Sequence, residues 1–307
     1  MNGPSDPTRF VHDKCAELGF ALCGVCEAQP TKWPRELWQW LEDGKHGEMD
    51  YLANHTAQRI DPGKMMPGIR SIICVADRYH DGSEDNAAHH EKGKGRIARY
   101  ARGDDYHVVM KKRLHQLCDA LIEAFPEETF RAFVDTAPVL EREHSTRAGL
   151  GAIGKHTLLI ETGVGSYLLL GEVITTLRLE PEDSKQTIDP CGTCTRCIDA
   201  CPTDAITPYS IDATKCISYL TIEHRGLIDE TLHEPMGDWI FGCDICQEVC
   251  PHNQPTHRTS EAPVHEAYSP RKTWKEGFDL VTILNWTEDD RREAFIKSSM
   301  KRAKLDM

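Results

Sequence analysis

Eight of the thirteen cysteines lie between Cys191 and Cys250, and their spacing is typical of a protein that binds two iron-sulfur clusters. The first run reads C-x2-C-x2-C-x3-C-P and contains Cys191, Cys194, Cys197 and Cys201. The second run repeats the C-x2-C-x3-C-P ending after a leading cysteine far upstream, and contains Cys216, Cys243, Cys246 and Cys250. Bacterial ferredoxins bind 4Fe-4S clusters with the first of these runs. The sequence therefore predicts two 4Fe-4S clusters.

The proline that closes each run predicts how the cysteines are divided. In two-cluster ferredoxins, the cysteine before this proline binds the other cluster. One cluster is therefore assigned to Cys191, Cys194, Cys197 and Cys250. The other cluster is assigned to Cys201, Cys216, Cys243 and Cys246.

Zinc is the main alternative, because four thiolates also suit a structural zinc ion. Zinc ribbons usually pair two C-x2-C knuckles, so a third cysteine and a closing Cys-Pro in both runs favour the iron-sulfur clusters. Disulfides are disfavoured because residues 1–10 lack the basic start and apolar core of a signal peptide. We therefore expect a protein of the reducing cytoplasm. No apolar run is long enough to cross a membrane, so no membrane association is expected.

The other five cysteines are predicted to be ordinary core residues. Cys23 and Cys26 form a C-x2-C pair, but they lie in a predicted strand, where residues three apart point to opposite faces. Cys15, Cys74 and Cys118 lie in apolar or helical surroundings, where lone cysteines are most often small buried residues.

Short apolar strands alternate with amphipathic helices ahead of the cysteine-rich part, which predicts a mixed α/β (α+β) fold. Strands are expected at 20–26, 71–76, 129–134 and 166–177. A helix near Asp104 would carry a buried stripe made of Met110, Leu114, Leu117 and Leu121. A similar stripe, expected to be packing, is made of Trp33, Leu37, Trp40 and Leu41. A loop is predicted at 81–94 and a domain boundary at 180–190.

The chain therefore divides into an N-terminal α/β domain (1–180), a ferredoxin-like domain (181–258) and a C-terminal helical tail (259–307). Its formal net charge of -13 argues against indiscriminate binding of nucleic acid. Basic residues nevertheless gather between Arg291 and Lys304, where six face one acidic residue. Such a run is usually a solvated helix face, and binding of an anionic partner is the alternative.

Gly149, Gly151 and Gly154 spell G-x-G-x-x-G, the pattern of a dinucleotide-binding turn. The preceding residues 141–147 are polar and helical in character, whereas a Rossmann turn requires an apolar strand there. We therefore expect these glycines to let the backbone pass close to another flat group or to a neighbouring strand.

Four further segments carry a family resemblance. They are 97–107, 134–141, 147–155 and 216–223, which read IARYARGDDYH, VDTAPVLE, RAGLGAIGK and CISYLTIE. Together they resemble epoxyqueuosine reductase, and the likeness runs from about Phe10 to Asn253. Members of that family are cytoplasmic, cobalamin-dependent enzymes with two 4Fe-4S clusters. They reduce an epoxide on the modified wobble base of certain tRNAs, the last step of queuosine synthesis. The resemblance implies that residues 1–180 form a cobalamin-binding catalytic domain.

By this resemblance, Asp135 is the catalytic acid. Its place at the end of a predicted strand is usual for a site residue in an α/β sheet, and a helix cap is the structural alternative. An aspartic acid that protonates the departing oxygen needs a raised pKa, which burial against the corrin ring would supply. We expect Asp135→Asn to keep both kinds of cofactor and to lose most turnover.

The resemblance also implies residues around the cofactor. The D-x-H-x-x-G motif that holds cobalt in other cobalamin proteins is absent from the sequence, so His107 and His156 are expected to be structural or hydrogen-bonding residues. Around the corrin amides or nucleotide tail, the family pattern implies Arg59, Tyr100, Lys155, Thr157 and Ser218. Asp244 is a further candidate for the edge of the cofactor, and Ala152 departs from the aromatic residue frequent in relatives.

The expected macromolecular partner is tRNA carrying epoxyqueuosine. Contacts to the RNA are expected from His224, Arg225, Lys297, Lys301, Arg302 and Lys304. A low-potential donor of the flavodoxin or ferredoxin type would supply electrons, and a monomer is expected. Two alternatives are a reductive dehalogenase, which pairs cobalamin with two clusters but typically carries a twin-arginine signal, and an electron-transfer ferredoxin without its own substrate.

Overall fold

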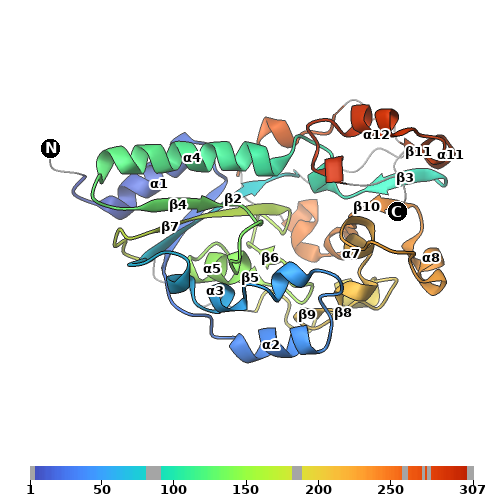
Figure 1. Cartoon of the computed structure of the whole chain (residues 1–307), viewed down its shortest axis with the longest axis horizontal. Helices are drawn as coiled ribbons and strands as arrows, with labels where there is room; N and C mark the ends of the chain where they lie inside the picture. Colours follow the sequence, from blue (N-terminus) through green and yellow to red (C-terminus); the bar gives the residue numbers. More distant parts are fainter. Residues whose placement is uncertain are drawn as a thin grey trace.

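A four-stranded antiparallel sheet forms the centre of the N-terminal part of the chain (Figure 1). In spatial order its strands are β1 (Leu22–Glu27), β2 (Ser71–Arg78), β7 (Leu168–Thr175) and β4 (Phe130–Phe133). All four lie where the apolar runs predicted strands, with ends that differ by at most two residues. Our computed structural model describes residues 4–80, 91–181, 189–257, 262–271, 274 and 278–302.

Two helices cover one face of this sheet. These are α1 (Pro7–Glu17) and the long helix α4 (Tyr106–Ala124), which lies along the sheet in Figure 1. The predicted stripe of α4 is confirmed, since Met110, Leu114, Leu117 and Leu121 are fully buried. Gly171 of β7 permits this close packing, because a Cβ there would lie 2.7 Å from the sulfur of Met110.

The opposite face of the sheet is covered by α5 (Glu141–Arg147) and by the hairpin of β5 (Ala152–Ile153) and β6 (Leu159–Ile160). Cys26 and Cys74 are buried on this side, while Cys23 packs against the other core, as the alternation of a strand predicted. Cys15 and Cys118 are also buried, which confirms the prediction of core cysteines.

The glycine-rich run does not form a dinucleotide-binding turn. It follows helix α5 and enters the β5–β6 hairpin, as expected from the polar residues before it. Gly151 adopts a φ of 145°, and a Cβ on it would lie 2.4 Å from the carbonyl oxygen of Ile160. The glycines therefore serve close approach to a neighbouring strand.

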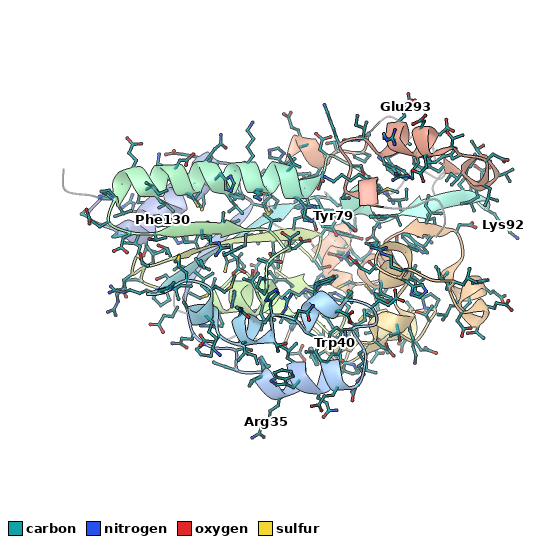
Figure 2. The ribbon with its side chains drawn as sticks, in the orientation of Figure 1. Arg35, Trp40, Tyr79, Lys92, Phe130 and Glu293 are labelled. Carbon is teal, nitrogen blue, oxygen red and sulfur yellow. The ribbon has the colours of Figure 1, made fainter. Side chains whose placement is uncertain are left out.

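Helix α2 (Pro34–Glu42) corrects one expectation. Trp40 packs partly buried beside the ferredoxin-like part, where its indole N–H donates to the carbonyl of Ile211 at 2.7 Å (Figure 2). Leu41 is buried, but Trp33 is 59 % exposed and is not a core residue. The next segments are η1 (Asp50–Leu52), α3 (Thr56–Ile60) and η2 (Pro62–Lys64).

The cysteine-rich part is built of short elements. Around the first run they are α6 (Arg196–Asp199), β8 (Ile206–Thr207), β9 (Ser210–Ile211) and η5 (Ala213–Lys215). Around the second they are α7 (Ile217–Ile222), α8 (Glu230–Met236), β10 (Trp239–Phe241), α9 (Ile245–Glu248), η6 (Pro251–Asn253) and η7 (Pro255–His257). A mixed α/β part followed by this small cluster-binding part is the predicted fold class.

The C-terminal residues pack onto both other parts. Their elements are η8 (Glu266–Tyr268), β11 (Phe278–Asp279), α11 (Leu280–Leu284), α12 (Glu288–Phe295) and η9 (Ser299–Arg302). Strand β3 (Lys94–Ile97) pairs with β10 on one side and with β11 on the other. A three-stranded sheet therefore joins segments from all three regions of the sequence, at the right of Figure 1.

Buried polar contacts join the N-terminal sheet to the cluster-binding part. Tyr79, near the centre of Figure 2, lies with its hydroxyl 3.2 Å from Nε2 of Gln247. Asn253 donates to the hydroxyl of Ser166 at 2.8 Å. Since these groups are buried and paired, they fix how the two parts sit.

Some expectations fall outside the described residues. Residues 81–90 of the predicted loop and 182–188 of the predicted domain boundary are among them, as are Lys304 and the side chain of Arg302. Within the described part of the chain, every helix is too short or too polar to span a lipid bilayer.

Candidate active site and cluster-binding region

Asp135 lies directly after β4 and is held from three sides. Its backbone φ of 37° is unusual for a residue with a side chain, and such strain often marks functional positions. One carboxylate oxygen accepts a hydrogen bond from the hydroxyl of Tyr106, and the other lies 3.0 Å from Nε2 of His107. Its backbone N–H donates to Glu141 at 2.6 Å. Helix α5 begins six residues later and is capped by Leu140, so Asp135 is not a helix cap.

His107 joins Asp135 to a second carboxylate. Its Nδ1 lies 2.7 Å from Asp105, the residue that caps the N-terminus of α4. Burial lowers the pKa of His107, but the hydrogen bonds to Asp105 and Asp135 outweigh it and raise the pKa to about 9. The imidazole is therefore a cation at neutral pH, and both of its ring nitrogens donate.

Glu141 adds a second acid beside Asp135. Its pKa is raised to about 8 by burial, followed by the negative charges of Glu172 and Asp135. Glu172 is fully buried in β7 and pairs with the imidazole of His144 at 2.7 Å. Glu141 therefore holds a proton at neutral pH, immediately behind the loop that carries Asp135.

Two arginines extend this region from Asp135 toward a cluster. Arg59 of α3 is buried and interacts electrostatically with Glu141. Its Nε has no hydrogen-bond partner among the residues that the structure describes. Arg142 lies within electrostatic reach of both Glu141 and the thiol of Cys246, and donates to the carbonyl of Thr157 at 2.9 Å. The unsatisfied Nε–H of Arg59 suits an amide oxygen such as those that fringe a corrin ring.

Other predicted cofactor residues are spread more widely. Thr157 has a φ of 69°, and Tyr100 packs edge-on against Tyr106, with ring centroids 5.9 Å apart. Thr157 is therefore linked to this region by its hydrogen bond from Arg142, and Tyr100 by its contact with Tyr106. Ser218 is half-buried on α7, two residues after Cys216.

Lys155 and Asp244 make contacts that sequence reasoning did not anticipate. The ammonium of Lys155 donates to the carbonyls of Gly192 and Cys194, at 2.6 and 2.9 Å, so it binds the loop of the first cysteine run. Asp244 is 1 % exposed and accepts from the backbone N–H and the guanidinium of Arg99, at 2.7 and 3.2 Å. Its carboxylate therefore faces Arg99.

The eight cysteines form two neighbouring sets. Burial raises the pKa of Cys250 to about 11, with a further contribution from nearby Cys191 and Cys197. Burial likewise raises the pKa of Cys243 to about 12, with contributions from Cys216 and Cys201. The thiolate is the form that binds metal, so cluster assembly must release these protons.

Backbone N–H groups also point at the cysteine sulfurs. Lys155 donates to Cys191 at 3.2 Å, and Ala205 donates to Cys201 at 3.4 Å. Hydrogen bonds to the sulfurs are among the factors that set the reduction potential of a cluster. The eight thiols interact electrostatically with other cysteines of their set, and as two groups of four sulfur ligands they suit two 4Fe-4S clusters.

Several of the cations expected to contact RNA lie beside an acidic residue. The backbone of Arg225 is anchored on Glu48 at 2.8 Å, and His224 lies 3.5 Å from the same carboxylate. Lys297 is exposed, whereas the ammonium of Lys301 lies 2.6 Å from Asp105. In α12, Arg291 and Arg292 are paired with Glu288 and Asp289. Ion pairs thus neutralise much of the basic segment.

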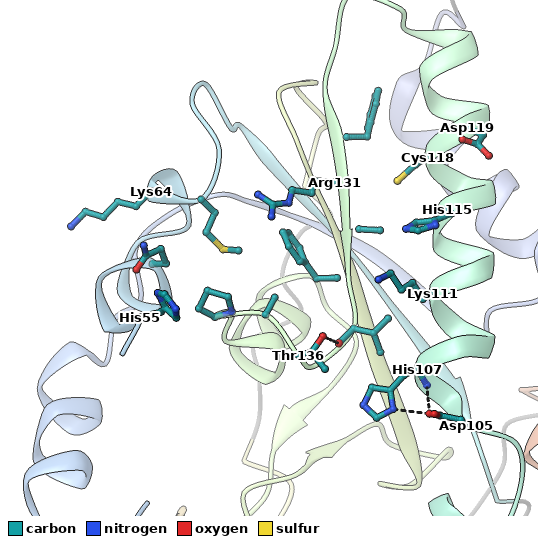
Figure 3. Close-up of a pocket in the computed structure, with 18 of the residues that line it drawn as sticks. His55, Lys64, Asp105, His107, Lys111, His115, Cys118, Asp119, Arg131 and Thr136 are labelled. Carbon is teal, nitrogen blue, oxygen red and sulfur yellow. Dashed lines mark hydrogen bonds and ion pairs between the residues drawn. The ribbon is translucent and has the colours of Figure 1, made fainter. Parts of the chain in front are cut away.

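A cavity of about 880 Å³ opens beside the Asp135 loop (Figure 3). It lies between α4, the edge strand β4 and the segment of α3 and η2. Its basic lining residues are His55, Lys64, His107, Lys111, His115, Arg131 and Lys301. Its acidic lining residues are Asp105 and Asp119. In a chain with net charge -13, this is a local excess of positive charge next to the candidate acid.

Sequence reasoning missed two groups that hold Asp135 in place. Tyr106 and Glu141 stand inside the segments that carried the family resemblance, but neither was given a role. The available signal was position, since Tyr106 adjoins His107 and Glu141 ends the segment that contains Asp135. The contact between Lys301 and Asp105 had no such signal.

Two family models match the chain. Residues 59–136 match the model described as epoxyqueuosine reductase QueG, DUF1730. Residues 190–253 match a 4Fe-4S double cluster binding domain. The second match confirms the prediction of two 4Fe-4S clusters, rather than zinc, in this part of the chain.

Curated relatives extend the likeness to nearly the whole length. An epoxyqueuosine reductase of Leadbetterella byssophila is 39% identical over 98% of this chain and 95% of its own. The epoxyqueuosine reductase of Escherichia coli K12 is 38% identical over 89% of this chain and 71% of its own.

Solved structures give the same result. An epoxyqueuosine reductase crystallised with an epoxyqueuosine-modified tRNA-Tyr stem loop matches with a TM-score of 0.81 and 26% identity, covering 96% of this chain and 77% of that one. The Bacillus subtilis enzyme, captured with the catalytic loop of an aspartate swung out of its active site, matches with a TM-score of 0.80 and 26% identity over the same shares. The chain therefore belongs to the epoxyqueuosine reductase family.

Proposed function

We propose that this protein reduces the epoxide of epoxyqueuosine in tRNA to the cyclopentene of queuosine, with cobalamin and two 4Fe-4S clusters as cofactors. The reaction consumes two electrons and two protons and releases the epoxide oxygen as water. When bound, reduced cobalamin supplies a strong nucleophile, and the clusters supply electrons one at a time. Family membership supports the reaction. The residues that lie in space between Asp135 and Cys246 support the proposal that the corrin binds there.

One observation carries the proposal at the level of residues. Asp135 is hydrogen-bonded to Glu141 through its backbone, and Arg142, the next residue, is in electrostatic reach of Cys246. A single turn of α5 therefore links the candidate acid to a cluster cysteine. Arg59, Tyr100 and Thr157 lie around this turn and would hold the cofactor between acid and cluster.

Proton supply follows from the contacts of Asp135. His107 is a cation whose Nε2 proton points at Asp135, 3.0 Å away. Transfer of that proton makes Asp135 the acid that protonates the ring oxygen, and His107 is left neutral and oriented to accept a new proton. Tyr106 fixes the other carboxylate oxygen, so the carboxyl group keeps one direction while the proton moves.

The basic cavity beside Asp135 is the proposed path of the RNA backbone. Lys111 and His115 face it from α4, Arg131 from β4 and Lys64 from the η2 segment (Figure 3). Phosphates next to the wobble base would be bound by these cations as the base enters the site. His224, Arg225 and Lys297 are further candidates for contacts with the RNA.

The remaining parts of the proposal rest on the same reasoning. Cysteine pairing follows the Cys-Pro rule, with Cys250 joining the first set and Cys201 the second. The electron donor is a flavodoxin or ferredoxin, and the enzyme acts as a monomer in the cytoplasm. The proposed domains are 1–180 for cobalamin and catalysis, 181–258 for the clusters and 259–307 for the tail.

Anaerobic reconstitution tests this function. The protein is loaded with iron, sulfide and cobalamin, reduced, and incubated with an anticodon stem loop carrying epoxyqueuosine. We expect nucleoside mass spectrometry to find queuosine, and no product when cobalamin is omitted. A loaded protein that leaves epoxyqueuosine intact, or that works equally well without the corrinoid, contradicts the proposal.

A further inference from the structure

The C-terminal segment reaches the residues that hold Asp135. Lys301, in η9, places its ammonium 2.6 Å from Oδ2 of Asp105, although the two residues are 196 positions apart. The side chain of Asp105 is 3 % exposed, and its other oxygen is bound to Nδ1 of His107. One buried carboxylate is thus shared by two cations from different regions of the chain.

The contacts continue to the candidate acid, since Nε2 of His107 lies 3.0 Å from Asp135. The order is Lys301, Asp105, His107, Asp135, so each charge has an opposite charge beside it. A carboxylate on Nδ1 of a histidine fixes the orientation of the ring and directs its other N–H. Here it directs that proton at Asp135.

Lys301 is held by a packed scaffold. Phe295 at the end of α12 and Met300 in η9 are buried in the core formed with Trp274 and Phe278. The carbonyl of Lys297 accepts from the backbone N–H of Asp105 at 2.8 Å.

A second set of contacts fixes the loop before α4. The hydroxyl of Ser298 donates to the carbonyl of Ala101 at 3.3 Å, and Arg271 pairs with Asp104 at 2.6 Å. The C-terminal segment therefore braces the loop 101–105 from which α4 begins. Groups on rigid, packed elements hold catalytic side chains more accurately than free loops do.

We propose that Lys301 is a positioning residue of the reductase reaction, which acts through Asp105 to hold His107 against Asp135. This inference rests on the proposed function of the site. It replaces the sequence-based expectation that Lys301 binds RNA phosphate, because its ammonium already faces a buried carboxylate. The groups that face His107 are Asp105 and Tyr106 at the start of α4, Asp135 after β4, and Lys301 through Asp105.

The first test separates positioning from RNA binding with Lys301→Met in the reconstituted enzyme. We expect the single-turnover rate at saturating stem loop to fall about 10- to 100-fold, the usual cost of removing an outer partner of a site residue. Affinity for the same stem loop, measured by fluorescence anisotropy without reductant, should stay within twofold, with an unchanged salt dependence. Lys112→Met, an exposed lysine of α4 that does not line the cavity, is the matched control and should keep its rate.

The second test asks whether Lys301 acts through Asp105. Lys301→Arg should restore most of the rate. In an Asp105→Asn background, adding Lys301→Met should cost less than threefold. Without Lys301, Asp105 attracts the His107 proton more strongly, so the alkaline limb of the pH–rate profile should move to higher pH in Lys301→Met and stay in place in Lys301→Arg.

Distinct outcomes would overturn the inference. Weaker RNA binding with a reduced salt slope and an unchanged single-turnover rate would make Lys301 an RNA ligand. An equal loss of rate with and without Asp105 would make its role independent of that carboxylate. Iron content and thermal unfolding of each variant identify any loss that is due to misfolding. If the wild-type enzyme itself does not convert epoxyqueuosine, the proposed function fails, and the unfolding midpoints of the Lys301 and Asp105 variants still test their coupling.

Discussion

The guanidinium of Arg99 reaches Asp244, a buried carboxylate between the cluster cysteines Cys243 and Cys246. The same arginine lies 2.8 Å from Glu248 on α9. Arg99 stands in the segment that leads from β3 to α4, seven residues before Tyr106. One side chain therefore ties the cluster-binding loop to the segment that presents Tyr106 and His107.

Breaking this contact should destabilise the protein strongly. Arg99→Met leaves the carboxylate of Asp244 buried without its cation, which typically costs about 3–5 kcal/mol. Denaturant unfolding under anaerobic conditions measures the change in the free energy of unfolding. Arg292→Met is the matched control, because Arg292 and its partner Asp289 are 71% and 89% exposed, and such pairs contribute about 1 kcal/mol or less. Similar small losses in both variants would contradict the structural role given to Arg99.

Replacing the candidate acid should separate binding from chemistry. Asp135→Asn keeps the shape of the side chain but removes the carboxylic acid, and general acid catalysis usually contributes about 10²- to 10⁴-fold. We expect that loss in the single-turnover rate, with cobalamin and iron contents equal to those of the wild type. Asp119→Asn, an acidic residue of the same cavity on α4, should keep full activity. Near-normal turnover of Asp135→Asn would remove Asp135 from the mechanism.

The crossed pairing of cysteines can be tested with double variants. If Cys191 and Cys250 bind one cluster, Cys191→Ser with Cys250→Ser should lose about half of the iron, because the other cluster keeps its four ligands. Cys191→Ser with Cys201→Ser should damage both clusters and lose most of the iron. Iron and sulfide analysis measures both, and Cys118→Ala, outside the runs, should lose none. If the first pair loses as much iron as the second, the assignment is wrong.

Stability should fall as the pH rises through the neutral range. The folded pKa of His107 is raised from 6.5 to about 9, so its contribution is complete below about 6.5 and is lost as the pH approaches about 9. The pKa of Glu141 is raised from 4.5 to about 8, so its contribution to stability is also lost as the pH rises, between about 4.5 and about 8. His107→Gln should flatten the curve between pH 6.5 and 9, where one proton corresponds to at most about 1.4 kcal/mol per pH unit. Thermal unfolding across that range tests this, and an equally steep decline in the variant would refute it.

The basic cavity should be the main electrostatic contact for RNA. Lys111→Ala and Arg131→Ala should each weaken binding of the stem loop and reduce the slope of log affinity against log salt by about one. Lys112→Ala is the matched control, since it removes the same charge from α4 at a position that does not line the cavity. Equal effects of all three substitutions would indicate a diffuse charge effect instead of a binding path.

The sheet and its long helix could be predicted because burial imposes a period on the sequence. The α4 stripe repeats at helical spacing, and all its members are fully buried. Trp33 shows the limit of this reasoning. An aromatic stripe predicts a helix with an apolar side, but whether that side is covered depends on neighbours from elsewhere in the chain. Trp33 lies exposed at the N-cap of the nine-residue helix α2.

Site residues could be predicted where the spacing of the ligands along the chain is itself typical of the site, as in the cysteine runs. Lys155 was expected near the corrin because it stands in a family segment, and Asp244 because it lies between two cluster cysteines. Neither pattern predicted the hydrogen bonds of Lys155 to the Cys191–Cys194 loop or the ion pair of Asp244 with Arg99. Such a hydrogen bond or ion pair depends on tertiary distance, which local pattern does not contain. For the same reason, the basic run gave no sign that Lys301 pairs with the buried carboxylate of Asp105.

The sheet centred on β3 has a consequence for how the protein is made. Strand β3 leaves the ribosome early, but its partner β11 follows only after about 180 further residues, which at typical rates of synthesis takes about 10–40 seconds. Throughout that interval one hydrogen-bonding edge of β3 is without its final partner, and such edges invite unwanted pairing. The three-stranded sheet can therefore be completed only after β11 has been made, and a chain that stopped before residue 278 would lack the strand that pairs with this edge of β3.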